Sequence, residues 1–308
     1  MGRNGVIQEE AKTMSNIEVL PIAGAVGAEI CGVDLSEPLN NANLAQIRKA
    51  FADHVVIFFR DQKITPEQHL AFGAHFGEFD VHRFAAGLPD HPEVMPVVKE
   101  ADDNGGNFGG LWHSDVTFYE KPALGSILYA LDVPTYGGDT MFASQYLAYE
   151  TLSDGMKEML EGMTAIHSAK RVYGNQGTSI NRFGAEVKSM KVRAGDDAEA
   201  EMEHPVIRYI PESGRRCLFV NPVYTIRFAG WTEEESKPLL DFLHTHAVRP
   251  EHTCRFKWET GSVAFWDNRA TQHYALNDYH GQRREMHRVT IVGERPMSIS
   301  EGERAKAA

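Results

Sequence analysis

The sequence predicts a mainly β protein with flanking helices, an α+β fold built as one domain from 308 residues. Two observations lead to this class. Short runs rich in β-branched and aromatic residues recur along the chain and dominate its final third, whereas only a few segments have helical spacing. No internal repeat with a fixed period is present. Many short strands with a few helices favour a β-sandwich or barrel core decorated by helices.

The N-terminal part should alternate strands with helices. Residues 17–35 are short β-type runs separated by glycines, and residues 41–54 (NANLAQIRKAFADH) have helical spacing with an Asn start. VVIFF, residues 55–59, is apolar throughout and predicts a short buried strand. A second helix should begin after Thr65, because Pro66 suits the first helical position and Gln68 completes a capping box.

The middle of the chain continues this pattern. Two β-type runs, 125–133 and 139–144, flank a PTYGGD turn, and helical material spans roughly 146–163. Another helix should occupy about 232–246, with a capping box from Thr232 and Glu235, although Pro238 disturbs its first turns. The final third is a succession of strands: HPVIRYI, RCLFV, CRFKWE, SVAFWD and REMHRVTIV.

Several segments have no strong pattern. Residues 1–15 and 297–308 are polar and are expected to be disordered tails on a single domain spanning 16–296. The loop at 102–111 is rich in Gly and Asn and is either a connector or a mobile rim beside a site. The polar stretch 168–204 either covers a pocket or is a disordered insert.

Composition excludes several classes of function. The net charge is −12, with acids and bases mixed along the chain, which argues against nucleic acid or an anionic membrane as a partner. An anionic ligand would therefore need a local basic patch. The three cysteines, Cys31, Cys217 and Cys254, are far apart, as expected of free thiols in a reducing compartment. No apolar run is long enough to span a bilayer, so a cytoplasmic enzyme is expected.

The segment GGLWHSDVTFYE, residues 109–120, contains a pattern typical of a metal site. If it is a strand, His113 and Asp115 project from the same face, where an unpaired buried charge would be costly. His273, 158 positions after Asp115, is the candidate third ligand. Two imidazoles and one carboxylate can hold one face of a ferrous ion, and the same atoms can hold zinc, so the ligands alone do not select the metal.

The segment QRREMHRVTIV, residues 282–292, supplies a cationic pair. Its β-branched end favours a strand, which would place Arg284 and Arg288 on one face with Met286 between them and Thr290 beyond. Buried guanidinium groups need anionic partners, which can be internal carboxylates or bound ligands. Beside a His/Asp/His set, ligand binding is the stronger interpretation.

At this point the chain resembles the taurine dioxygenase/TfdA family of iron(II)- and 2-oxoglutarate-dependent dioxygenases. The resemblance covers nearly the whole chain. Its segments, in order, are IEVLPIAGAVGAEICGVDLSEPL, FFRDQKITPEQHLAFGAHFGEF, LWHSDVTF, PTYGGDT, WDNRATQHYALNDY and RREMHRVTIVGERP. The resemblance implies a double-stranded β-helix, or jelly-roll, core. It also implies Fe(II), 2-oxoglutarate as co-substrate and O₂, with succinate and CO₂ as co-products.

The resemblance also implies a role for individual residues. His113, Asp115 and His273 would be the iron ligands. Arg284 would hold the distal carboxylate of 2-oxoglutarate, assisted by the hydroxyl of Thr140. The primary substrate would be bound by four residues: His82, the backbone of Val116, Phe219 in the pocket wall, and Arg288 at the anionic group.

Departures from the family pattern bear on the substrate. Taurine-specific members carry an aromatic hydroxyl and an Asn at positions held here by Ala85 and Gly109. The loss of two polar contacts suits a bulkier anionic molecule, and IHSAKRVYG, residues 166–174, resembles the aryloxyalkanoate-degrading branch. The expected activity is hydroxylation of an aryloxyalkanoate or sulfonate, leading to C–O or C–S cleavage.

Two alternatives stay open at this stage. One is a taurine dioxygenase proper, and the other is a zinc-dependent hydrolase or isomerase on a jelly-roll fold. The absence of a GxSxG elbow, a P-loop or a dinucleotide fingerprint gives no support to other common enzyme classes. Relatives in the resembled family often form dimers or tetramers, so a homo-oligomer is expected.

Overall fold

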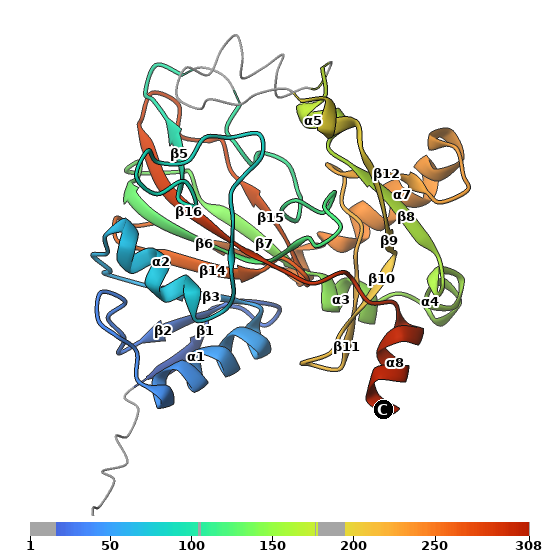
Figure 1. Cartoon of the computed structure of the whole chain (residues 1–308), viewed down its shortest axis with the longest axis horizontal. Coiled ribbons are helices and arrows are strands. Elements are labelled where there is room, and N and C mark those ends of the chain that lie inside the picture. The colour runs from blue at the N-terminus through green and yellow to red at the C-terminus, as the bar shows by residue number, and fades with distance from the viewer. Residues whose placement is uncertain (1–16, 104–105, 176, 178–194, 308) are drawn as a thin grey trace, which may run out of the picture.

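A computed structural model describes residues 17–103, 106–175, 177 and 195–307 (Figure 1). Within these residues the largest unit is an eight-stranded mixed sheet. Seven strands follow the order β1-β2-β3-β14-β6-β16-β4, and β5 also pairs with β16. Their bounds are β1 Glu18–Pro21, β2 Ala28–Cys31, β3 Val56–Phe59, β14 Val263–Asp267, β6 Ala123–Asp132, β16 Arg284–Val292, β4 Phe79–Asp80 and β5 Met95–Lys99.

A second sheet packs against one face of the large sheet. It consists of β13 (Thr253–Phe256), β7 (Thr140–Ser144) and β15 (Thr271–Ala275), paired in that order and antiparallel. Side chains from both sheets share one buried core, in which Phe58 of β3 stacks on Phe256 of β13 at 3.9 Å between ring centroids. Two sheets closed over a common apolar core form the sandwich that the sequence predicts.

Helices α1 (Asn41–His54) and α2 (Pro66–Ala74) cover the other face of the large sheet (Figure 1). Helix α1 starts at Asn41 as predicted and is capped by the preceding Asn40, and the predicted capping box of Thr65 and Gln68 is present on α2. The apolar face of α1 is buried, with Phe51 stacked on Phe265 of β14 at 4.0 Å. The large sheet is therefore buried on both faces, which explains why its central strands are apolar throughout rather than alternating.

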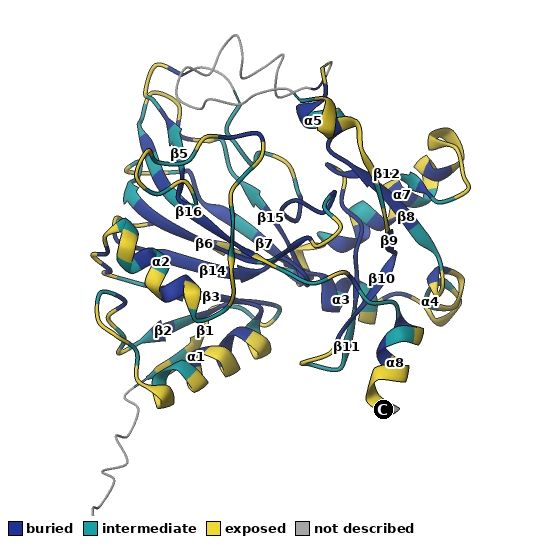
Figure 2. Ribbon diagram, viewed as in Figure 1, coloured by how far each residue is buried: buried dark blue, intermediate teal, exposed yellow. Residues whose placement is uncertain are grey.

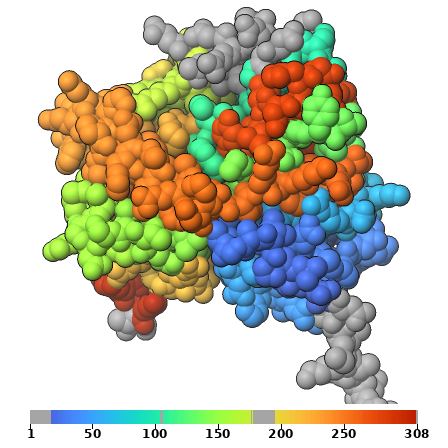
Figure 3. Space-filling model, turned by 180° about the vertical axis from the view of Figure 1, so that it is seen from behind, coloured from blue at the N-terminus to red at the C-terminus, as the bar shows by residue number. Residues whose placement is uncertain are grey.

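A third layer lies beside the sandwich. It contains the sheet β12-β8-β9, the hairpin β10-β11, and four helices. The bounds are β8 Thr164–Ser168, β9 Glu201–Pro205, β10 Ile207–Ile210, β11 Arg215–Leu218, β12 Thr225–Phe228, α3 Gln145–Glu150, α4 Asp154–Leu160, α5 Lys170–Tyr173 and α7 Glu233–Ala247. Seen from behind, α7 and the blue N-terminal region occupy opposite sides of the molecule (Figure 3). Short 3₁₀ turns lie at Asp196–Glu199 and Pro250–His252.

The expectation about the C-terminal end needs correction. Residues 297–308 were expected to be a disordered tail, but Ile299–Ala307 form helix α8. Ile299 is buried in an apolar cluster, and Met297 forms a backbone bridge with Tyr209, so both kinds of contact hold this polar-looking segment. Figure 2 shows buried, intermediate and exposed residues along α8. The polar stretch 168–204 contains α5, a 3₁₀ turn and the start of β9 in its described part. Residues 176 and 178–194 of that stretch, like the predicted tail 1–15, lie outside the described residues.

Two further sequence predictions can be compared with the structure. Cys31, Cys217 and Cys254 are all free thiols, as predicted. Among the described residues, no helix is long and apolar enough to cross a membrane. The cytoplasmic location and the homo-oligomeric state stay predictions.

Candidate active site

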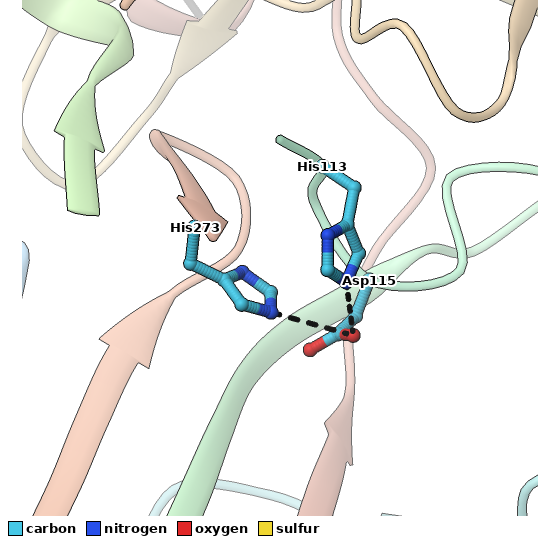
Figure 4. Close-up of side chains that lie close together, drawn as sticks. All are labelled: His113, Asp115 and His273. Carbon is cyan, nitrogen blue, oxygen red and sulfur yellow. Dashed lines mark ion pairs between the residues drawn. The ribbon is translucent and has the colours of Figure 1, made fainter. Parts of the chain in front are cut away.

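Three buried side chains meet between the two sheets of the sandwich. His113, Asp115 and His273 each offer a ligand atom, and these atoms lie within 4.8 Å of one another (Figure 4). Asp115 Oδ1 is 3.7 Å from His113 Nε2 and 3.9 Å from His273 Nε2. Such separations let one divalent ion contact all three groups, since metal–nitrogen and metal–oxygen bonds are about 2 Å long.

The local backbone around this site differs from the predicted strand. His113 forms a β-bridge to His273 of β15, with His113 N donating to His273 O at 3.1 Å and His273 N to His113 O at 2.8 Å. The chain then turns, and Val116 has a positive φ of 46°. The segment is therefore an isolated bridge followed by a turn and not a strand, although His113 and Asp115 face the same site. We call residues 113–117 the ligand turn.

The carboxylate of Asp115 is oriented by two neighbours. Its Oδ2 accepts from Ser126 Oγ at 2.8 Å and from Asn268 Nδ2 at 3.3 Å. Asn268 Oδ1 in turn accepts from the backbone N of Asp115 at 3.1 Å and from the Trp266 indole. These bonds occupy Oδ2 and leave Oδ1 directed at the imidazoles, as expected for groups that orient a metal ligand.

The histidine of the ligand turn also has a defined orientation. His113 Nδ1 lies 2.7 Å from the carbonyl oxygen of Leu111. A carbonyl can only accept, so Nδ1 carries the proton and Nε2 keeps its lone pair for a metal. Burial lowers the pKa of both His113 and His273 below the ordinary histidine value. Neutral imidazole, the form that binds metal, is therefore favoured at neutral pH.

Asp115 is ionised in the same surroundings. Burial acts to raise the pKa of Asp115, but the nearby cation of Arg288, followed by the two imidazoles and the Ser126 hydroxyl, holds it well below its usual range. Arg288 Nη1 donates to Asp115 Oδ1 at 2.9 Å. The cluster thus presents two neutral nitrogens and one anionic oxygen, a donor set that suits a ferrous ion.

A small cavity of about 40 Å³ adjoins the triad on the side of Arg284. Thr140 and Arg284 line it together with His113 and His273. Arg284 is 5% exposed, and its Nε and Nη2 have no hydrogen-bond partner among the described residues. A buried, unpaired guanidinium is costly, so this group fits a carboxylate ligand such as that of 2-oxoglutarate. Thr140 Oγ1 accepts from the Trp258 indole at 2.9 Å.

A larger cavity of about 310 Å³ also adjoins the triad and shares Phe108, Gly109, His113 and Arg288 with the small one. Arg288, His82 and Val116, the predicted substrate residues, line it next to His113 and Asp115. Burial lowers the pKa of His82 to about 3, so its imidazole is neutral. The remaining walls are largely apolar or aromatic and include Phe108, Leu111, Val172, Tyr173, Val223 and Tyr224. The cavity therefore combines one cationic end with an apolar body.

One predicted site residue does not reach the cavity. Phe219 is buried, but it is absent from the lining, and its ring packs between His167 and His204 with the Arg208 guanidinium 5.1 Å from its centroid. Phe219 N bonds to Val206 O, which holds this residue in the third layer. Tyr224, five residues later, contributes an aromatic wall instead. The expectation that Phe219 lines the pocket is not met.

Several residues that shape the site are not among the ligand and substrate residues predicted from the sequence. Ser126 and Asn268 hold Asp115, Trp258 holds Thr140, and Tyr173 and Tyr224 line the cavity. The quoted segments WDNRATQHYALNDY and IHSAKRVYG do contain Asn268 and Tyr173. A buried Asn in an otherwise apolar strand end was an available hint, because buried amides need partners.

The His/Asp/His group, next to a guanidinium-lined pocket and a larger cavity in a jelly-roll sandwich, is the kind of site that holds a single divalent metal ion. The sequence matches the family described as "Taurine catabolism dioxygenase TauD, TfdA family" over residues 18–290, and the chain belongs to that family.

Curated relatives are similar over nearly their full length. An alpha-ketoglutarate-dependent sulfate ester dioxygenase of Pseudomonas putida is 37% identical over 292 residues, which is 92% of this chain and 92% of the relative. An alkylsulfatase of Acinetobacter baylyi is 35% identical over 286 residues, or 90% and 86% of the two chains.

Solved structures share the fold. A taurine dioxygenase from Burkholderia xenovorans superposes with a TM-score of 0.77 at 38% identity and covers 92% of this chain and 94% of its own. The structure of AAD-2 in complex with Mn(II) and N-oxalylglycine gives a TM-score of 0.73 at 27% identity, covering 91% and 98%.

These findings establish the class of enzyme. The chain is a dioxygenase of the TauD/TfdA family with the jelly-roll core of its structural neighbours, and Fe(II), 2-oxoglutarate and O₂ are its cofactor and co-substrates. They give no support to a zinc hydrolase or isomerase.

Proposed function

We propose that the enzyme oxidises an alkyl sulfate ester, using 2-oxoglutarate and O₂, and releases the sulfate group. The observation that carries this proposal is the shape and chemistry of the larger cavity. Arg288 lines it beside the ligand turn, and the lining also contains apolar and aromatic side chains together with His82, Asn107 and Asn277. A molecule with an anionic head and an alkyl tail matches this arrangement.

Arg288 would hold the sulfate group by paired N–H bonds. Its side chain is 6% exposed, and its Nε has no partner among the described residues, so it can donate to a ligand. His82 is neutral and lines the same cavity, as do the phenol groups of Tyr173 and Tyr224. These polar groups would fix the head group, and the carbon next to the ester oxygen would then face the metal.

The small cavity lined by Arg284 and Thr140 would hold the co-substrate 2-oxoglutarate. Arg284 would bind the distal carboxylate of 2-oxoglutarate, and the Thr140 hydroxyl, held by Trp258, would assist. His113, Asp115 and His273 would hold iron through His113 Nε2, Asp115 Oδ1 and His273 Nε2. When bound, iron supplies the oxidative chemistry that inserts one atom of O₂ into a substrate C–H bond while 2-oxoglutarate becomes succinate and CO₂.

Product release follows from the chemistry of the hydroxylated carbon. A carbon that carries both a hydroxyl and a sulfate ester oxygen is unstable. Its C–O bond to sulfate breaks, the electron pair leaves with the sulfate, and the hydroxyl proton is lost as the carbonyl forms. Each turnover therefore gives one aldehyde, one inorganic sulfate, one succinate and one CO₂.

Two observations bear on the alternatives of taurine and other sulfonates. The positions where taurine-specific members carry polar side chains hold Ala85 and Gly109, and Gly109 lines the larger cavity. The similar proteins with known activities include sulfate ester enzymes. An alkyl sulfate is therefore favoured over taurine, and an aryloxyalkanoate is the second candidate because the apolar walls can also accept an aryl group.

The test is a panel assay of the purified enzyme with Fe(II), 2-oxoglutarate and O₂. The panel should contain alkyl sulfates of increasing chain length, alkyl sulfonates, taurine and aryloxyalkanoates. We expect aldehyde, sulfate and succinate in equal amounts from alkyl sulfates. Turnover confined to taurine or to aryloxyalkanoates would disprove the sulfate ester assignment without affecting the dioxygenase class.

A further inference from the structure

Thr117 links the ligand turn to two other parts of the molecule. It lies two residues after Asp115 and is 1% exposed. Its hydroxyl accepts from Asn221 Nδ2 at 3.1 Å and lies 3.0 Å from His167 Nδ1. Asn221 and His167 are themselves almost completely buried, at 2% and 0% exposure. Water therefore cannot easily replace either contact.

Asn221 holds the backbone of two residues that line the substrate cavity, Val223 and Tyr224. Its Oδ1 accepts from Val223 N at 3.1 Å and from Tyr224 N at 2.9 Å. Val223 and Tyr224 both line the larger cavity. One amide group thus bonds to the hydroxyl of Thr117 with its nitrogen and to the cavity lining with its oxygen.

His167 is connected through the chain to a second part of the cavity wall. It belongs to β8, and the chain continues from β8 directly into α5, where Val172 and Tyr173 line the same cavity. Ser168, the last residue of β8, donates its backbone N–H to Tyr224 O at 2.9 Å. We call Val172, Tyr173, Val223 and Tyr224 the outer wall.

The backbone between the metal ligand and Thr117 is strained. Val116 has a φ of 46°, a left-handed conformation that is unfavourable for a β-branched residue. Such a conformation persists only when neighbouring contacts hold it. Asn268 holds the backbone of Asp115 on one side, and Asn221 and His167 hold the side chain of Thr117 on the other.

We propose that Thr117 is a positioning residue that sets the distance between the iron ligands and the outer wall of the substrate cavity. Its hydroxyl is the point at which Asn221 and His167, each leading to one part of that wall, meet the ligand turn. A substrate held against the outer wall then presents a defined carbon to the metal. This proposal rests on the dioxygenase activity and applies to whichever anionic substrate the enzyme oxidises.

The experiment compares Thr117→Val, which keeps the shape but removes the hydroxyl, with Thr117→Ser, which keeps the hydroxyl. The main measurement is the amount of oxidised product formed per succinate. For Thr117→Val we expect a fall in this ratio and a loss in kcat/KM of about tenfold, because small displacements of the reacting carbon are costly. Thr117→Ser should restore most of the ratio. Mn(II) binding, measured by titration calorimetry, should be unchanged in both variants.

A second variant and a control separate positioning from general stability. His167→Phe removes one partner of Thr117 without altering the ligand turn, and it should lower the same ratio. Ser236→Ala removes a buried hydroxyl of α7 that accepts from Phe228 N at 3.0 Å, and it should lower the melting temperature without changing the ratio. A wild-type ratio in both Thr117→Val and His167→Phe, or loss of Mn(II) binding in Thr117→Val, would overturn the proposal.

Failure of this proposal is distinguishable from failure of the sulfate ester assignment. The ratio can be measured with any substrate that the wild-type enzyme oxidises in the panel assay. If alkyl sulfates are not oxidised but another anion is, the comparison of Thr117→Val with Thr117→Ser proceeds with that anion.

Discussion

Arg288 and Asp115 form an ion pair in which Arg288 Nη1 donates to Asp115 Oδ1 at 2.9 Å. Both side chains are almost fully buried, at 6% and 4% exposure. The same carboxylate oxygen faces both imidazoles, and the same guanidinium lines the substrate cavity. The charge that would hold the substrate anion therefore also balances a metal ligand.

Replacing Arg288 with Met should affect both the buried carboxylate of Asp115 and the binding of the substrate anion. Without metal, the buried carboxylate of Asp115 loses its counter-charge, and we expect the protein to lose about 3–5 kcal/mol of stability. Bound Mn(II) should recover much of this loss because the cation takes over the pairing. The measurement is urea unfolding with and without Mn(II), together with KM for the substrate, which should rise. The control is Arg283→Met: that side chain is 38% exposed, and its loss should cost about 1 kcal/mol or less.

His113→Ala should abolish metal binding and turnover while leaving the fold nearly intact. The variant removes one of the three ligand atoms. The β-bridge between residue 113 and His273 is formed by main-chain atoms, so it does not depend on the imidazole. Calorimetric titration with Mn(II) and a circular dichroism spectrum provide the readouts. His91→Ala, which changes an imidazole paired with Glu67 away from the site, serves as a control. Normal Mn(II) affinity in His113→Ala would contradict the ligand assignment.

Arg284→Lys should raise the 2-oxoglutarate concentration needed for half-maximal activity. A lysine keeps the charge but cannot form the two parallel N–H bonds of a guanidinium. Burial already lowers the pKa of Arg284, and the same burial would favour a neutral lysine still more strongly. Binding of 2-oxoglutarate to the Mn(II)-loaded protein can be measured directly. An unchanged affinity for 2-oxoglutarate would show that Arg284 does not bind the co-substrate.

The phenol groups of Tyr173 and Tyr224 should contribute to recognition of the head group. Both rings line the cavity, and Arg288 is close enough to act on the pKa of each. Tyr173→Phe and Tyr224→Phe keep the aromatic wall but remove a hydroxyl. We expect KM for an alkyl sulfate to rise about tenfold or more, since a hydrogen bond to a charged group contributes about 1.5–3 kcal/mol. Equal KM values in the wild type and both variants would show that the two hydroxyls do not bind the head group.

Acid should destabilise the protein through buried histidines outside the site. Burial lowers the pKa of His69 from 6.5 to about 3, so the folded protein keeps this imidazole neutral. The unfolded chain takes up a proton below pH 6.5, and the folded protein does so only near pH 3, so stability is lost as the pH falls between these values. At pH 5.5 this one group should cost about 1.4 kcal/mol. His69→Gln should make the free energy of unfolding less pH-dependent between pH 7 and 5.

The sequence predicts the fold class and the meeting of His113, Asp115 and His273 better than it predicts the local geometry of these residues. Capping patterns place the starts of α1, α2 and α7 correctly, because side-chain caps are local interactions. The alternation of Arg284, Met286 and Arg288 also corresponds to a strand, β16. These features depend on neighbouring residues only.

Features that depend on distant residues were not predictable in the same way. The turn at Val116 is stabilised by side chains more than 50 residues away in the sequence, such as Asn221 and Asn268. Phe219 follows an apolar strand and resembles a pocket residue, but packing of the third layer directs it away from the cavity. Tertiary contacts, and not local patterns, decide both outcomes.

The C-terminal helix α8 limits how the polypeptide can be shortened or extended for laboratory use. Gly302 packs so closely on the ring of Tyr209 that a Cβ at that position would come within 2.1 Å of it. A version ending at residue 296 would uncover the Tyr209 ring and remove Ile299 from the third-layer core, favouring aggregation of the shortened chain. Truncation experiments should therefore keep the whole of α8, Ile299–Ala307.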